Sequence, residues 1–183
     1  MSKSHFDDSA MAAKRWWDQL RPREVNGRSI PGDRAALARL RRASTVMEAA
    51  AEPVTGDLYR KLKFSHPARD LPRAALIAAV LAHVKEDTHV LVARDIGTPR
   101  GGEGTTALIT PLRFKRLVSA RDPDDLLVAF RRAVAILGGT ANVSDLARQL
   151  LTWTDEHHGD LARTRFAFEY HGAGPFAPDQ TAA

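Results

Sequence analysis

The chain has 183 residues, of which 44% are hydrophobic and 27% charged, and its formal net charge is +5. It contains no cysteine, which excludes disulfides, thiolate metal ligands and cysteine nucleophiles. The first residues lack the apolar segment of a signal peptide, and the longest apolar run, residues 74–82, is too short to span a bilayer. We therefore expect a cytoplasmic protein that does not associate with membranes.

The N-terminal part predicts two helices joined by a loop. An acidic, serine-containing start is typical of a helix N-terminus and predicts a first helix over residues 7–22. The dipeptides Asn-Gly and Pro-Gly place a loop over residues 24–33. Asp33 is then the expected N-cap of a second helix, which opens with "RAALARLRRA" and should continue to about Ala50.

This second helix has one apolar and one cationic face. At 100° per residue, an apolar stripe that should pack against a core is formed by Leu37, Leu40, Ser44 and Met47. The remaining surface carries four arginines and no acid, whereas a purely solubilising face usually mixes charges of both signs. The helix therefore predicts either a solvated basic face or a surface that binds an anionic partner.

The middle of the chain predicts a buried helix followed by a connector. A shorter helix is expected over residues 52–62, and the alanine-rich segment 70–87 predicts the most buried helix. Residues 95–106 hold four glycines and a proline, which favours a flexible connector. This segment lacks the lysine and the spacing of a phosphate-binding P-loop.

The C-terminal part predicts further helices with recognisable ends. Thr110 and Asp122 each precede a proline suited to the first turn of a helix. The helix from Asp122 should end at Gly138-Gly139 and leave Arg131 and Arg132 outside. Another helix should open at Asn142, and a last one should cover residues 160–171.

These elements predict an all-α fold of about eight helices in two small packed bundles. The expected organisation is an N-terminal helical lobe over residues 1–94, a glycine-rich loop over 95–110, a C-terminal helical lobe over 111–171 and a disordered tail over 172–183.

Catalytic and metal-binding patterns are weak. The segment "DEHHGD", residues 155–160, offers histidines and carboxylates, but adjacent helical residues diverge by 100° and cannot easily share an ion. A metal-dependent nuclease built on this segment is the least favoured interpretation; we expect no catalytic residue, no metal and no cofactor. Trp16 and Trp17 should pack in the core, with base stacking by one of them as the alternative, because adjacent positions cannot both face inward.

Arginines are concentrated in three stretches, "RLRR", "RFKR" and "FRRAV", each on the outer face of a predicted helix. One such helix is usually only solvated, but three with little interleaved acid favour a binding surface. Planar guanidinium groups suit phosphates. Since nothing resembles a helix-turn-helix recognition helix, such a surface would follow a nucleic-acid backbone without reading bases.

The ordered set of motifs resembles the CasB family, the small subunits of the type I-E CRISPR effector complex called Cascade. The resemblance rests on "PGDRAALARLRRA", on "RFKRLVSA" followed by "FRRAV", and on "LLTW", and it covers about residues 16–170. It implies a non-catalytic subunit that lies as two head-to-tail copies beside the backbone and large subunits. Its basic surfaces would stabilise the pairing of guide RNA with target DNA and the displaced strand of the R-loop.

Carried onto this sequence, the resemblance implies nucleic-acid contacts by ten basic residues: Arg34, Arg39, Arg41, Arg42, Arg113, Lys115, Arg116, Arg121, Arg131 and Arg132. Arg41 and Arg131 lie close to apolar stripes and are expected to be structural, whereas Arg39 and Arg42 are the better candidates for contact. The alternative, from a different class, is a helical interaction scaffold whose basic faces dock acidic protein partners.

Overall fold

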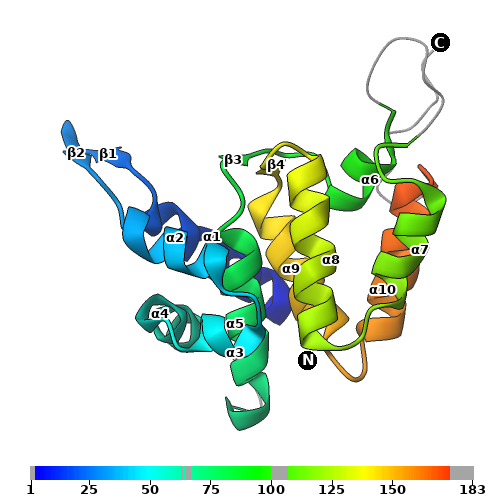
Figure 1. Ribbon diagram of the computed structural model, residues 1–183, viewed down its shortest axis with the longest axis horizontal. Coiled ribbons are helices and arrows are strands. Elements are labelled where there is room, and N and C mark those ends of the chain that lie inside the picture. The colour runs from blue at the N-terminus through cyan, green and yellow to red at the C-terminus, as the bar shows by residue number, and fades with distance from the viewer. Residues whose placement is uncertain (1–2, 63, 65–66, 100–106, 174–183) are drawn as a thin grey trace.

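The structure is a computed structural model that describes residues 3–62, 64, 67–99 and 107–173 (Figure 1). These residues contain ten helices, eight of them with seven or more residues, which confirms the predicted all-α class. The helices are α1 (Lys3–Leu20), α2 (Arg34–Arg42), α3 (Val46–Ala50), α4 (Pro53–Lys61), α5 (Pro67–Leu81), α6 (Val92–Gly97), α7 (Pro111–Ser119), α8 (Pro123–Ile136), α9 (Val143–Trp153) and α10 (Gly159–Tyr170).

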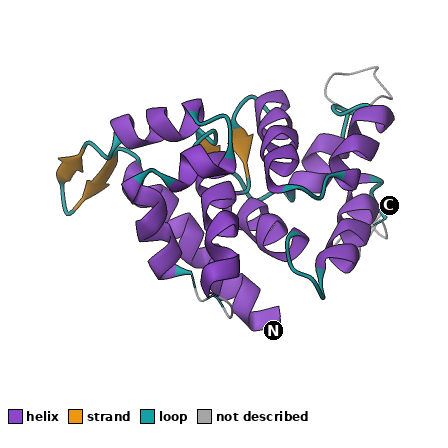
Figure 2. Cartoon of the chain, turned by 60° about the horizontal axis from the view of Figure 1, so that its bottom comes forward, coloured by secondary structure: helices purple, strands orange, loops and turns teal. Residues whose placement is uncertain are grey.

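Two short strand pairs accompany the helices. An antiparallel hairpin, β1 (Arg23–Val25) and β2 (Arg28–Ile30), projects from the body of the molecule (Figure 2). A parallel pair, β3 (Glu86–Asp87) and β4 (Thr140–Ala141), joins the segment after α5 to the segment after α8. Residues 95–97 of the predicted glycine-rich loop are the last turn of α6, while residues 100–106 and the tail from 174 lie outside the described residues.

The predicted second helix is two helices, α2 and α3, so the expectation of one helix to about Ala50 is wrong. Thr45 Oγ1 accepts a hydrogen bond from the backbone N–H of Glu48 (3.1 Å). The Glu48 carboxylate in turn accepts a hydrogen bond from the backbone N–H of Ser44 (2.6 Å). This T-x-x-E arrangement is close to a capping box, which starts a new helix. The apolar stripe consequently ends early, and Met47 is 78% exposed.

Several other predicted helix ends are confirmed, although α1 begins at Lys3 rather than at residue 7 and α5 ends at Leu81 rather than at residue 87. The side chains of Asp33, Asp122 and Asn142 accept hydrogen bonds from the first-turn N–H groups of α2, α8 and α9. Thr110 stands at the N-cap of α7, but its side chain makes no capping hydrogen bond. Gly138 follows α8 with a positive φ of 72°, the left-handed conformation that ends many helices.

The core is centred on α5, which confirms that this is the most buried helix. Residues 74–82 are each at most 1% exposed, and α5 packs against α3, α4, α8 and α9. The helix α1 packs against α4 and α9. Helices of both predicted lobes therefore contribute to one hydrophobic cluster, and the division into lobes over 1–94 and 111–171 stays a prediction.

Trp16 and Trp17 are both buried, each 2% exposed, so the premise that adjacent helical positions cannot both face inward is wrong. The indole of Trp16 donates to the carbonyl of Val54 in α4 (2.9 Å), and that of Trp17 donates to the carbonyl of Val84 after α5 (3.3 Å). Because α1 is covered on more than one side, both rings pack in the core and neither is presented to a nucleic-acid base.

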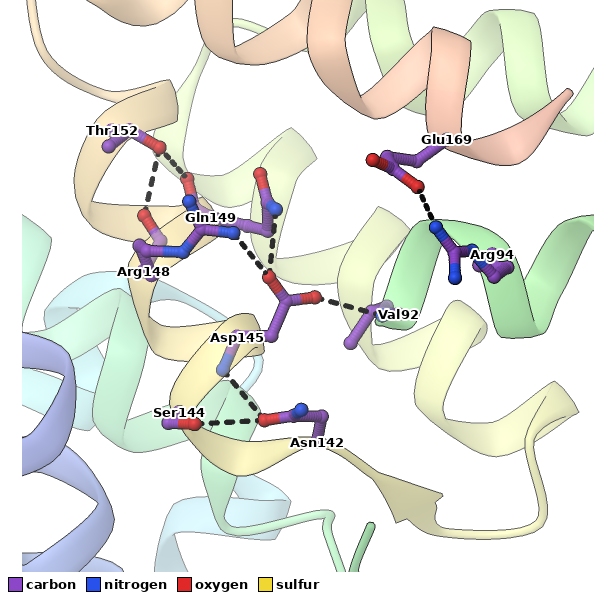
Figure 3. Close-up of polar contacts among 9 residues, drawn as sticks. All are labelled: Val92, Arg94, Asn142, Ser144, Asp145, Arg148, Gln149, Thr152 and Glu169. Atoms are coloured by element: carbon purple, nitrogen blue, oxygen red, sulfur yellow. Dashed lines mark hydrogen bonds and ion pairs between the residues drawn. The ribbon is translucent and has the colours of Figure 1, made fainter. Parts of the chain in front are cut away.

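A buried carboxylate fastens α6 to α9. Asp145, 4% exposed, accepts hydrogen bonds from the backbone N–H of Val92 (2.8 Å), from Arg148 (2.9 Å) and from Gln149 (3.0 Å) (Figure 3). The other side of α6 is held to α10, where Arg94 pairs with Glu169 at 2.7 Å. These contacts fix the segment that leads from α5 towards α7.

Candidate nucleic-acid interface

A groove of about 1010 Å³ lies between α7 and α8, and we call it the α7–α8 groove. Four of the ten predicted contact residues line it: Arg113, Lys115, Arg116 and Arg132. All four side chains are exposed, and among the described lining residues the only carboxylate is that of Asp125. Two consecutive helices thus bring four cations to one concave surface, three from α7 and one from α8.

The pattern of buried residues explains this arrangement. On α7, Phe114 and Leu117 face inward, at 7% and 3% exposure, so the basic residues between and beside them face solvent. The ring of Phe114 stacks on that of Tyr170 in α10, with centroids 3.7 Å apart, and the Tyr170 hydroxyl donates to the carbonyl of Ile109 (2.7 Å). These contacts hold α7 against α10 and fix the wall of the groove.

The surface between the cations is aliphatic. Leu112 and Val128 are 63% and 40% exposed, and both line the groove. No aromatic side chain is among the described lining residues, so the groove has no platform for base stacking. These two residues could not be identified from the sequence, because periodicity alone does not distinguish exposed apolar positions on a helix from core positions.

Two other predicted contact residues of this region, Arg131 and Arg121, make hydrogen bonds to backbone carbonyls within the protein. Arg131 is half-buried rather than on the outer face, because its guanidinium donates to the carbonyls of Ala43 (2.5 Å) and Leu40 (2.9 Å) at the C-terminal end of α2. Burial lowers its pKa. Arg121 donates to the carbonyl of Val118 (2.8 Å) and so caps α7.

The four predicted residues of α2 lie at the other end of the molecule's long axis from α7 (Figure 1). All are exposed. Arg39 pairs with Glu52 at 2.7 Å, and Arg41 donates to the carbonyl of Ala82 (2.6 Å). Within the described part of the chain, no hydrogen bond or ion pair is found for Arg42. The structure therefore does not bring the ten predicted residues into one surface, and their nucleic-acid contacts stay a prediction.

The segment 155–160 forms the turn between α9 and α10. The Asp155 carboxylate accepts from the backbone N–H groups of His157 and His158, both at 3.1 Å, and its Oδ1 lies 2.6 Å from the His158 Nδ1. These bonds give the histidine-rich stretch a local structural role. In the described residues, no group of three potential metal-ligating side chains is found.

A half-buried histidine that follows α5, His83, predicts pH-dependent stability. Desolvation, together with the charges of Arg131 and Arg41, lowers the pKa of His83 from 6.5 to about 4. Because the unfolded chain then binds more protons between these values, the free energy of unfolding should fall as pH decreases from 6.5 towards 4. Since the ring is half-buried and partly screened, we expect a loss of about 1 kcal/mol at pH 5.

The measurement is urea unfolding from pH 7.5 to 4.5 of the natural chain and of His83→Gln. The natural chain should lose more stability than the variant across this range. Equal pH dependence of the two proteins would contradict a neutral, poorly solvated His83.

None of the helices in the described chain combines the length and the apolarity needed to cross a membrane. A family model described as CRISPR-associated protein Cse2 matches residues 36–171. Among solved structures, one titled crystal structure of M. ruber CasB matches with a TM-score of 0.57 and 19% sequence identity, covering 90% of this chain and 93% of that chain. This similarity shows a shared fold. No curated protein matches the sequence significantly.

Proposed function

This chain belongs to the CRISPR-associated Cse2 (CasB) family, the non-catalytic small subunits of type I-E Cascade, and we propose that it binds nucleic acid through the α7–α8 groove. The bound strand would be guide RNA, target DNA or displaced DNA. Contacts to the backbone would favour R-loop formation, a nearly balanced exchange of one duplex for another that small contributions can tip.

One observation carries the proposal: four cations from two helices line one groove, and Asp125 supplies the single carboxylate among its described lining residues. Arginine forks and a lysine ammonium bind phosphate oxygens through charge-assisted hydrogen bonds. Such contacts are independent of base identity, and much of the groove surface between the cations is aliphatic. The groove is therefore suited to following a strand without sequence preference.

We also propose where the chain acts and which proteins it contacts. In the cytoplasm, the chain would assemble with the backbone and large subunits of Cascade and with a second copy of itself. The exposed surface outside the groove would contact these neighbours.

The experiment is a salt titration of binding by the purified chain to fluorescein-labelled single-stranded DNA, single-stranded RNA and duplex DNA. Affinity should fall as salt rises from 50 to 300 mM, with a log–log slope of about −3 for four phosphate contacts. Strands of unrelated sequence should bind within about twofold of each other. Absence of binding at 50 mM salt would contradict the proposal.

A second candidate, a scaffold that docks an acidic protein partner, is favoured by the exposure of Leu112 and Val128 in the groove. The same titration separates the two candidates. A scaffold would bind its acidic protein partner with an affinity that falls as salt rises, because salt screens the attraction between opposite charges, and it would not bind nucleic acid at low salt.

A further inference from the structure

A second concavity lies away from the α7–α8 groove, where the C-terminal end of α1, α2 and the segment after α5 meet (Figure 1). Its volume is about 270 Å³, and its lining residues are Arg21, Pro22, Arg34, Leu37, Arg41, Val84 and Lys85. Four of these are cationic, and the described lining includes no carboxylate. The volume lies below the roughly 300–1,000 Å³ of typical small-molecule pockets, so it suits a small anionic group.

The hairpin brings two of these cations together. Gly32 packs against the backbone of Leu20 and Arg21, and a Cβ at Gly32 would lie 2.5 Å from the carbonyl carbon of Arg21. The backbone N–H of Asp33 donates to the carbonyl of Leu20 (3.0 Å). The β1–β2 hairpin therefore returns the chain to the end of α1 (Figure 1). Arg34, the first residue of α2, consequently lines the same concavity as Arg21.

Three of the cations are held by contacts that leave their charged groups available. The guanidinium of Arg21 lies 4.5 Å from the ring centre of Trp17, a cation–π contact. Arg41 uses its Nε for the carbonyl that follows α5, which leaves its two Nη groups. The stem of Lys85 lies against Gly139, where a Cβ would be 3.0 Å from Lys85 Cδ. This preorganisation lowers the entropic cost of binding.

We propose that Arg21, Arg34, Arg41 and Lys85 form a pocket that binds a single phosphate group. Four like charges around one small concavity repel one another, and an anion between them removes that repulsion. Arg21 and Lys85 extend this site beyond the residues indicated by the sequence. The proposal rests on the proposed function in that nucleic acid supplies the phosphate, either within a backbone or at a strand end.

The test is calorimetric titration with inorganic phosphate at constant ionic strength. The natural chain should bind phosphate, and Lys85→Gln and Arg34→Gln should each weaken that binding at least tenfold. Both residues are exposed, so both variants should retain the helical circular dichroism. Arg42→Gln is the matched control, because Arg42 is exposed on the same helix but does not line the pocket; it should bind phosphate within twofold of the natural chain.

Single-stranded decamers with and without a 5′-phosphate then distinguish the two sources. If the pocket binds the phosphate at a strand end, the 5′-phosphate should raise the affinity at least fivefold, and Lys85→Gln should abolish this gain. If the pocket binds a backbone phosphate, the two decamers should bind with equal affinity, and Lys85→Gln should reduce both affinities.

Two outcomes separate this proposal from the proposed function. In the first, mutation of the α7–α8 groove abolishes nucleic-acid binding, Lys85→Gln and Arg34→Gln leave it unchanged, and the chain does not bind phosphate. This result would overturn the pocket alone. In the second, the chain binds phosphate only when Lys85 is present and does not bind nucleic acid. This result would support the pocket and overturn the proposed function.

Discussion

Replacing Arg116 and Arg132 together by Glu should lower the affinity for nucleic acid about 100-fold at 0.1 M salt. The two residues come from α7 and α8 and line the same groove, so one strand would meet both. Each substitution removes a phosphate contact and adds a repulsive charge. Loss of two contacts should also make the log–log salt slope shallower by about 1.5. Fluorescence anisotropy over a salt series measures both quantities.

The matched control is Arg60→Glu with Lys61→Glu on α4, which changes the net charge by the same amount far from the groove. If binding depends on the groove, this control should stay within about threefold of the natural chain. If both double variants lose affinity equally, only the total charge matters, and the α7–α8 groove is not the site. Unchanged circular dichroism is required of both, since all four side chains are exposed.

Replacing Asp145 by Ala should lower the free energy of unfolding by about 3 kcal/mol. The substitution leaves the buried N–H of Val92 without its acceptor and removes the partner of Arg148 and Gln149 (Figure 3). For a chain of this length, the expected fall in melting temperature is about 6–12 °C. Urea unfolding followed by circular dichroism at pH 7 checks this expectation.

Asp160→Ala provides the control, because Asp160 also pairs with an arginine three residues away but has an almost fully exposed side chain. Its melting temperature should stay within about 1 °C of the natural value. A similar small change for Asp145→Ala would mean that α6 does not depend on this carboxylate.

The elements that could be predicted from the sequence carry local chemical signals. Asp122 and Asn142 stand before helices as capping residues, and the run of alanine and aliphatic residues in α5 identifies the centre of the core. The break between α2 and α3 also has a local signal, since Thr45 and Glu48 have capping-box spacing. Apolar periodicity continues across this break and therefore predicts one helix, whereas the capping residues end the first helix and begin a second.

The placement of the cations could not be predicted in the same way. Periodicity shows which face of a helix a residue occupies, but it does not show what covers that face. Arg131 and Arg132 are neighbours in sequence, yet one binds the end of α2 and the other lines the α7–α8 groove. Arg21 and Arg34 meet only because Gly32 returns the chain to the end of α1. These are consequences of tertiary packing.

The contact of Arg131 with the end of α2 has a mechanical consequence. The guanidinium ties the carbonyls of Leu40 and Ala43 to the helix that carries Arg132, so α2 and the α7–α8 groove are fastened to one rigid element. The side chains of α5 are fully packed and contact both α2 and α8, so relative movement of the two cationic surfaces would disrupt the core. If anions bind at both surfaces as proposed, this shared core would hold them at one separation.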